Sequence, residues 1–260
     1  MARGDFVWCD LSTFRIETAL AFYEDLFGWS YNSIYQPDGT PYQIASTGQG
    51  EAAGLFEMPK KFQEIGMPSF WMSYIQVDNA AATVAEANRS GGKVEVGPVA
   101  FDESSQIALI RDPLGAGFTV YQGSDLQPRH GDMGGPGQMI WNALYVSDPS
   151  AVTGFYEALF DWRISTDAGR PGVHAVHNEA GHQIASIHAA SDQFRGGYEF
   201  WGVHFSVQDL AQALAGVGQG GGEVLGELDE TARRGTLVRD PDGAAFFLVD
   251  GSESTPTFPD

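Results

Sequence analysis

Apolar side chains in the first part of the chain follow first a strand pattern and then a helix pattern. Residues 6–12, FVWCDLS, form a short and mostly apolar run that is typical of a buried strand. Beyond it, apolar residues recur at helical spacing, which places them on one face of a helix that Gly28 ends. These residues are Ile16, Ala19, Leu20, Tyr23 and Phe27. Two further strands are predicted near 42–46 and 52–57.

The same order of elements follows once more before residue 123. WMSYIQV, residues 71–77, alternates as a strand does, and Asn79 is a suitable N-cap for a helix that ends at Gly91-Gly92. Two more strands are predicted at 106–111 and 117–121. The tetrapeptide Asp112-Pro113-Leu114-Gly115 joins them as a hairpin turn.

The second half of the chain repeats the first. FYEDLFGW at 22–29 returns as FYEALFDW at 155–162, with six of eight positions identical. LIRDPLGAGFTVYQG at 109–123 likewise returns as LVRDPDGAAFFLVDG at 237–251, and the two tryptophans Trp71 and Trp201 are matched core positions. Landmarks in one order at nearly constant offset predict a tandem duplication. The predicted parts are a first domain at 5–123, a linker at 124–138, a second domain at 139–251 and a tail at 252–260.

The repeated motifs resemble those of a known superfamily. A strand, a helix ending in FYxxLFGW and a closing RDPxGxxF hairpin are similar to the vicinal oxygen chelate superfamily, which includes glyoxalase I, bleomycin-resistance proteins and extradiol dioxygenases. The resemblance occurs once in each half, and together the two occurrences cover nearly the whole chain. It implies an α+β fold of tandem domains, each made of two βαβββ modules that form a curved sheet cup. It leaves open whether the cups form within each copy or between the copies.

In the metal enzymes of this superfamily the cup holds a divalent cation, bound by His, Glu or Gln side chains. The corresponding places in this chain carry Trp8, Trp141, Met72, Gly202, Thr119 and Phe247, with a last place near 54–56 and 186–188. Tryptophan, glycine, phenylalanine and methionine do not hold such an ion. We therefore predict no metal and no other cofactor. A displaced site built on His188 and His204 with a borrowed carboxylate is the alternative.

Without a metal, the predicted cup is lined by aromatic and modestly polar groups. Such a lining is typical of a small-molecule pocket, although the same side chains could simply fill the cup as core. Aromatic walls suit planar or cationic ligands. The predicted ligand-binding residues are Trp8, Asp10, Met72, Tyr74, Thr119, Tyr121, Trp141, Tyr145, His188, His204 and Phe247.

Composition narrows the choice of partner. The chain has 14 basic and 34 acidic residues, for a net charge of −20. Such a surface repels nucleic acid and anionic membranes and attracts cations. No apolar run approaches the ~18 residues of a membrane span, and the first residues lack a signal-peptide core. The single cysteine, Cys9, permits no internal disulfide and is expected to be buried. These features favour a cytoplasmic monomer or homodimer.

The sequence thus predicts a metal-free binding protein of the glyoxalase and bleomycin-resistance type. Its ligand would be a planar aromatic compound, which the acidic surface would favour in a cationic form. One alternative is a lyase, isomerase or dioxygenase that uses a displaced metal or a side-chain acid or base, such as Asp10, Tyr74 or His204. Another is a structural duplicate with no ligand. Whether any reaction is catalysed stays open at this point.

Overall fold

The first copy of the repeat contains eight strands and three helices within the described residues. The computed structural model describes residues 3–102, 104–129, 135–228 and 235–251. The predicted tail and residues 130–134 of the predicted linker lie outside this part. The elements of the first copy are β1 (Phe6–Thr13), α1 (Ile16–Phe27), β2 (Ser30–Tyr35), β3 (Pro41–Thr47), β4 (Gly50–Glu57), α2 (Lys60–Glu64), β5 (Phe70–Gln76), α3 (Ala80–Arg89), β6 (Lys93–Ala100), β7 (Gln106–Arg111) and β8 (Gly117–Gln122).

The second copy repeats this order element by element. Each copy forms one mixed eight-stranded sheet, in the orders β2-β3-β4-β1-β5-β8-β7-β6 and β10-β11-β12-β9-β13-β16-β15-β14. The α+β fold expected from the sequence is therefore confirmed. The elements of the second copy are β9 (Met139–Val146), α4 (Ser150–Phe160), β10 (Arg163–Thr166), β11 (Val173–His177), β12 (Gln183–Ala189), α5 (Asp192–Arg195), β13 (Phe200–Val207), α6 (Leu210–Gln219), β14 (Glu223–Leu228), β15 (Gly235–Arg239) and β16 (Ala245–Asp250).

Local signals in the sequence fix most helix and turn ends. The Asn79 side chain accepts a hydrogen bond from the backbone of Ala82 at 2.9 Å and caps α3. Gly28 ends α1 in the left-handed region, with φ of 68°, where the absence of a Cβ removes the steric cost. In the part of the chain that the structure describes, no helix has the length and apolarity of a membrane span.

The sequence patterns did not locate the strands β2 and β6 at the ends of the first sheet. Both are largely exposed, with one half-buried position in β2 and two in β6. A strand at a sheet edge faces solvent with much of its surface, so its side chains need not alternate between apolar and polar. Periodicity therefore detects the central strands and misses the edges.

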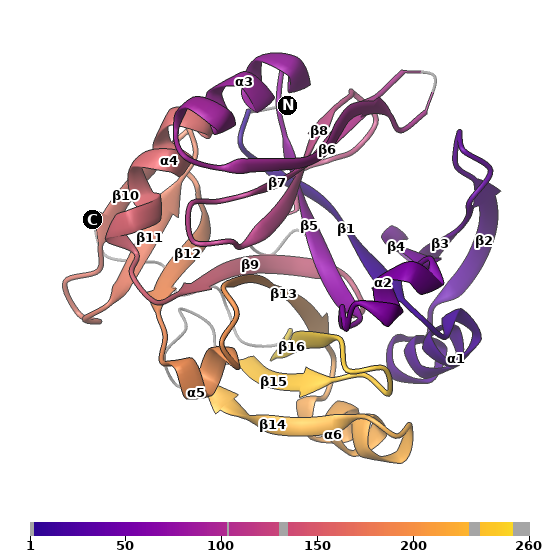
Figure 1. Ribbon diagram of the computed structural model, residues 1–260. Coiled ribbons are helices and arrows are strands. Elements are labelled where there is room, and N and C mark those ends of the chain that lie inside the picture. Colours follow the sequence, from indigo (N-terminus) through magenta and orange to yellow (C-terminus); the bar gives the residue numbers. More distant parts are fainter. Residues whose placement is uncertain (1–2, 103, 130–134, 229–234, 252–260) are drawn as a thin grey trace. The chain divides into compact units, whose positions relative to one another are not determined.

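Spatial contacts divide the chain into two compact units, and each unit draws on both copies. Unit 1 comprises Met1–Trp8, Met72–His130 and Trp141–Gly202. Unit 2 comprises Cys9–Trp71, Gly131–Ile140 and Val203–Asp260. Within unit 1, α3 packs against α4 (Figure 1). Within unit 2, α1 packs against α6 in the same way. The second copy thus supplies a partner helix for α1 and for α3 of the first copy.

The repeated FY and RDP motifs meet in the core of each unit. In unit 1 the Tyr156 hydroxyl donates to Asp112 Oδ2 at 3.0 Å and accepts from Trp201 Nε1 at 2.8 Å. Asp112 Oδ1 accepts from the backbone N–H groups of residues 114, 115 and 116. We call this set of Tyr156, Asp112 and Trp201 the tyrosine clasp of unit 1. It ties the helix of one copy to the hairpin turn of the other.

Unit 2 contains the same arrangement. The Tyr23 hydroxyl donates to Asp240 Oδ2 at 3.1 Å and accepts from Trp71 Nε1 at 3.0 Å. These three residues form the tyrosine clasp of unit 2. Burial, followed by the charge of the adjacent aspartate, raises the pKa of each clasp tyrosine well above its ordinary value, so both hydroxyls keep their protons. The repeated motifs that carry the resemblance thus have a structural role in this chain.

Candidate functional site

The predicted ligand-binding residues are divided between the two units. Unit 1 holds eight of them, and unit 2 holds the other three, which are Asp10, His204 and Phe247. All except Met72, which is half-buried, are buried. The eight of unit 1 fall into three groups with different neighbours: Trp8; Met72, Tyr74, Thr119 and Tyr121; and Trp141, Tyr145 and His188.

Trp8 of β1 is covered by a cation from its own chain. The guanidinium carbon of Arg129 lies 5.1 Å from the centroid of the Trp8 ring. The Arg129 backbone N–H donates to the Phe6 carbonyl at 2.7 Å, and its Nε donates to the Val7 carbonyl at 3.2 Å. These bonds hold the guanidinium against the ring in a cation–π contact. The aromatic face expected to receive a cationic ligand thus already carries a positive charge.

Two members of the second group of unit 1, Tyr74 and Tyr121, pack on Phe101, which the sequence analysis did not single out. The centroid of the Phe101 ring lies 6.3 Å from Tyr74 and 6.3 Å from Tyr121. Tyr74 and Thr119 are neighbours in the parallel pair of β5 and β8. The Tyr121 hydroxyl bonds to Asp125, and burial together with that carboxylate raises the pKa of Tyr121. This group therefore resembles packed core.

The third group contains a short chain of buried polar atoms. Trp141 Nε1 lies 3.4 Å from Ser186 Oγ, and Ser186 Oγ lies 2.7 Å from His188 Nε2. Ser186 and His188 are two residues apart on β12, so both side chains point to the same face of the strand. Tyr145 is the parallel neighbour of His188 on β9, and the two rings stack at 5.1 Å with an angle of 25°. We call Trp141, Tyr145, Ser186 and His188 the His188 cluster.

His188 is neutral at ordinary pH. Burial, followed by the electrostatic influence of Arg170 and of His174, lowers the pKa of His188 to about 4. Arg170 itself is held by Asp167, with Nη2 and Oδ2 2.5 Å apart. The imidazole thus offers one N–H donor and one acceptor nitrogen rather than a charge.

Two further rings complete the His188 cluster, and neither was predicted. Phe194 of α5 and Phe200 of β13 pack on Tyr145, with centroid distances of 5.1 and 5.3 Å. Both rings are half-buried and form the edge of the cluster toward solvent. Phe194 lies on a four-residue helix that no periodic pattern could reveal. Phe200 directly precedes the matched Trp201 and could have been suggested by strand alternation.

The three predicted residues of unit 2 lie in tightly packed surroundings. His204 and Phe247 are neighbours in the parallel pair of β13 and β16, and their rings stack at 4.3 Å and 9°. His204 has no exposed surface. Asp10 of β1 is 3% exposed and lies opposite Gly54 of β4. Because His188 belongs to unit 1, the pairing of His188 with His204 that the sequence suggested stays a prediction.

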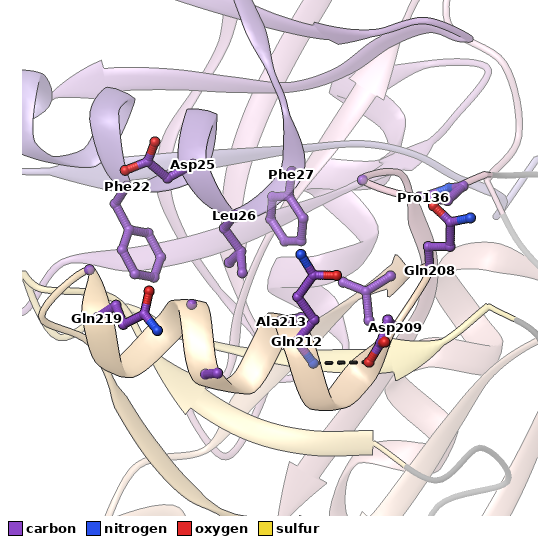
Figure 2. A pocket seen from close by; sticks show the side chains of 15 residues that line it. Phe22, Asp25, Leu26, Phe27, Pro136, Gln208, Asp209, Gln212, Ala213 and Gln219 are labelled. Atoms are coloured by element: carbon purple, nitrogen blue, oxygen red, sulfur yellow. Dashed lines mark hydrogen bonds between the residues drawn. The ribbon is translucent and has the colours of Figure 1, made fainter.

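Unit 2 also carries a surface groove that contains none of the predicted residues. It lies between α1 and α6 and has a volume of about 670 Å³. Figure 2 shows Phe22, Leu26 and Phe27 of α1 pointing toward α6. At Gly220 a Cβ would come within 2.8 Å of the Phe22 ring, so this glycine permits the close approach of the two helices. The Asp209 carboxylate is occupied as the N-cap of α6.

Both halves of the chain match one family model. The Glyoxalase/Bleomycin resistance protein/Dioxygenase superfamily matches at residues 5–120 and 138–248. The chain belongs to this superfamily. The resemblance inferred from the repeated motifs is therefore confirmed.

Two relatives in sequence span nearly the whole chain. CFP32 of Mycobacterium tuberculosis, whose name assigns it provisionally to the glyoxylases, is 30% identical over 261 residues, which are 95% of each chain. The anthracycline biosynthesis protein DauV of Streptomyces sp. strain C5 is 26% identical over 277 residues, covering 100% of this chain and 98% of its own.

Solved structures of the superfamily share the fold at low sequence identity. The 2,3-dioxygenase LapB of Pseudomonas sp. KL28 aligns with a TM-score of 0.65 at 11% identity, covering 100% of this chain and 96% of its own. The Mn(II)-bound glyoxalase of Novosphingobium aromaticivorans aligns with a TM-score of 0.63 at 13% identity, covering 100% and 87%.

The superfamily implies a divalent metal, and the residues of this chain do not fit one. Trp8 and Trp141 stand where ligands would be expected, and the Trp8 ring faces the Arg129 guanidinium. Phe247 stacks on His204. Among the described residues, His, Cys, Asp and Glu form no group of three or more that could hold a metal ion. Indole and phenyl rings supply no lone pair to a hard or borderline cation, so we derive no chemistry through a metal here.

Proposed function

We propose that this chain is a small-molecule-binding protein that holds a planar aromatic ligand at the His188 cluster of unit 1, with no metal taking part. The observation that carries the proposal is the stack of Tyr145 on His188, bordered by the half-buried rings of Phe194 and Phe200. Such rings recognise a flat apolar molecule through offset stacking and area burial, at little cost in side-chain entropy.

The remaining predicted residues support this choice of cluster. Arg129 already covers Trp8, and Phe101 packs between Tyr74 and Tyr121. Beside the His188 cluster, in contrast, the rings of Phe194 and Phe200 are only half-buried. The His188 cluster combines stacked rings with a polar chain, which is the usual makeup of a small-molecule site.

The names of two relatives agree with a flat ligand. DauV of Streptomyces sp. strain C5 and DnrV of Streptomyces peucetius, 26% identical to this chain, are named as anthracycline biosynthesis proteins. Anthracyclines are polycyclic aromatic compounds that carry ketone and phenol oxygens. We propose a ligand of this general kind, and the positive charge of Arg170 near His188 favours an uncharged or anionic form over a cationic one.

Calorimetric titration of the purified protein with the planar ketone fluorenone tests this proposal. We expect micromolar binding that is unchanged by a chelator. Tyr145→Ala and Phe194→Ala should each weaken it by about tenfold, or ~1.4 kcal/mol. Tyr198→Ala is the matched control, because Tyr198 lies in the same unit and is 67% exposed. Loss of binding on chelation, or equal affinity in all variants, would contradict the proposal.

A further inference from the structure

One ring nitrogen of His188 has no hydrogen-bond partner among the residues that the structure describes. His188 is 2% exposed, its Nε2 is bonded to Ser186, and its Nδ1 has no partner within bonding distance in this part of the chain. Buried polar atoms are nearly always paired, so a buried nitrogen without a protein partner indicates a place where another molecule can bond.

The contacts of Ser186 determine which nitrogen carries the hydrogen. The indole Nε1 of Trp141 can only donate, so Ser186 Oγ accepts from it. The other hydrogen bond of Ser186 Oγ is to His188 Nε2, and the serine hydrogen finds an acceptor there only if that nitrogen is bare, which is the arrangement we infer. In a neutral imidazole the other nitrogen then bears the hydrogen. His188 Nδ1 is accordingly an N–H donor, and it needs an acceptor atom.

The surroundings of this donor favour oxygen acceptors without positive charge. Arg170 and His174 are near enough to His188 to disfavour its protonated form. The Arg170 guanidinium disfavours an ammonium group at this place, whereas a carbonyl oxygen meets no such repulsion. Because the Tyr145 ring lies at only 25° to the imidazole, a flat molecule that meets Nδ1–H edge-on would also lie nearly parallel to the Tyr145 ring.

We propose that His188 Nδ1–H donates a hydrogen bond to a ketone, quinone or phenolate oxygen of the bound aromatic molecule. This inference rests on the proposed function, because it names the polar anchor and the ligand class of the same site. Trp141 and Ser186 are positioning residues, since they fix the tautomer of His188 and do not touch the ligand oxygen. The site selects planar ketones over hydrocarbons and amines of the same shape.

Three planar tricyclic probes of similar size test the selectivity in the unmodified protein. Fluorenone carries a ketone, fluorene has a methylene group in its place, and aminoacridine is a cation at neutral pH. We expect fluorenone to bind at least tenfold more tightly than either of the others. Equal affinity for fluorenone and fluorene would overturn the anchor while leaving the proposed function standing. Tighter binding of aminoacridine would contradict the proposed ligand class. If none of the three probes binds, the proposed function itself is refuted.

Substitutions at the anchor separate its role from that of the rings. His188→Phe keeps a flat ring and removes the donor, so fluorenone should lose its tenfold advantage while fluorene binds as before. His182→Gln is the matched control, because His182 is an exposed histidine close by in the chain. Unchanged selectivity in His188→Phe would refute the inference.

The tautomer has a readout that does not depend on any ligand. In ¹⁵N-labelled protein the His188 ring should show Nδ1 protonated and Nε2 bare, and Ser186→Ala should abolish that preference. On addition of fluorenone the Nδ1–H resonance should move downfield. An Nε2–H tautomer in the unmodified protein would contradict the proposal.

Discussion

Trp8 and Trp141 stand at the same place in the two copies, yet their surroundings have opposite character. The ring of Trp8 carries the Arg129 guanidinium, which comes from the segment after the first copy. The indole N–H of Trp141 instead begins the polar chain through Ser186 to His188. Duplication thus produced two equivalent tryptophans, one covered by a cation and one linked to a neutral hydrogen-bond donor.

The tyrosine clasps, in contrast to the two tryptophans, have nearly the same geometry in the two units. The Tyr–Asp distances are 3.0 and 3.1 Å, and the Trp–Tyr distances are 2.8 and 3.0 Å. Each clasp ties a helix of one copy to a turn of the other, so neither copy can change it alone. The two copies can therefore differ in the groups around Trp8 and Trp141 while the shared clasps stay the same.

The largest effect is expected from removing the clasp carboxylates. Asp112→Ala leaves the backbone donors of the turn and the Tyr156 hydroxyl without their acceptor, so it should lower the free energy of unfolding by about 3–4 kcal/mol. Asp240→Ala should cost a similar amount if the two clasps are equivalent. Urea denaturation measures both, with Asp25→Ala, an exposed aspartate, as the control. A loss of less than about 1 kcal/mol in the free energy of unfolding for only one of the two variants would show that the clasps are not equivalent.

Sequence patterns predicted the turn but not this clasp. Asp112 stood out as a hairpin residue and Tyr156 as part of the repeated motif FYEALFDW, yet they come from different copies and meet only through tertiary packing. The duplication, the central strands and the Asn79 cap could be predicted because they rest on local spacing. The edge strands could not, since exposure removes their periodicity. Phe101 and Phe194 were missed for a related reason, because Phe101 lies in a loop and Phe194 on a helix too short to show a periodic pattern.

Part of the candidate site could likewise be predicted, because residue spacing along a strand shows which side chains share a face. Strand position pointed to Trp141, Tyr145 and His188, and the structure brings these three together with Ser186. The same reasoning proposed Trp8 as a ligand wall, and no pattern indicated that Arg129, over 120 residues away, would cover it. Alternation tells which face a side chain takes, but not which distant group will fill the space in front of it.

The second largest effect concerns the pH dependence of the His188 cluster. The pKa of His188 is about 4 in the folded protein, against ~6.5 in an unfolded chain. Between these values the unfolded chain binds more protons, so stability rises with pH. The contribution is fully present above about pH 6.5 and is lost as the pH falls toward 4. Its full size is on the order of 3 kcal/mol.

His188→Gln isolates this contribution, because glutamine does not titrate. Between pH 7 and pH 4.5 the unmodified protein should lose about 2 kcal/mol more stability than the variant. Other acidic groups titrate in both proteins and cancel in the difference. His182→Gln should behave like the unmodified protein. Parallel stability curves for the unmodified protein and His188→Gln would show that His188 is not held neutral by burial.

The smallest effect should come from uncovering Trp8. Arg129→Ala removes a half-buried cation–π contact, so it should lower the free energy of unfolding by about 0.5–1 kcal/mol. Arg89→Ala, an exposed arginine that carries the same charge, is the matched control.

Arg129→Ala should also change the binding of a cationic ligand. With the guanidinium gone, the Trp8 ring offers its negative face to an external cation, and the net charge of −20 favours the approach of one. Aminoacridine should then bind to Arg129→Ala more tightly than to the unmodified protein and quench tryptophan fluorescence. The double variant Trp8→Phe, Arg129→Ala should lose most of that gain in quenching. If the affinity for aminoacridine is unchanged by Arg129→Ala, the guanidinium is not what separates Trp8 from Trp141, and the difference between them lies in the His188 cluster alone.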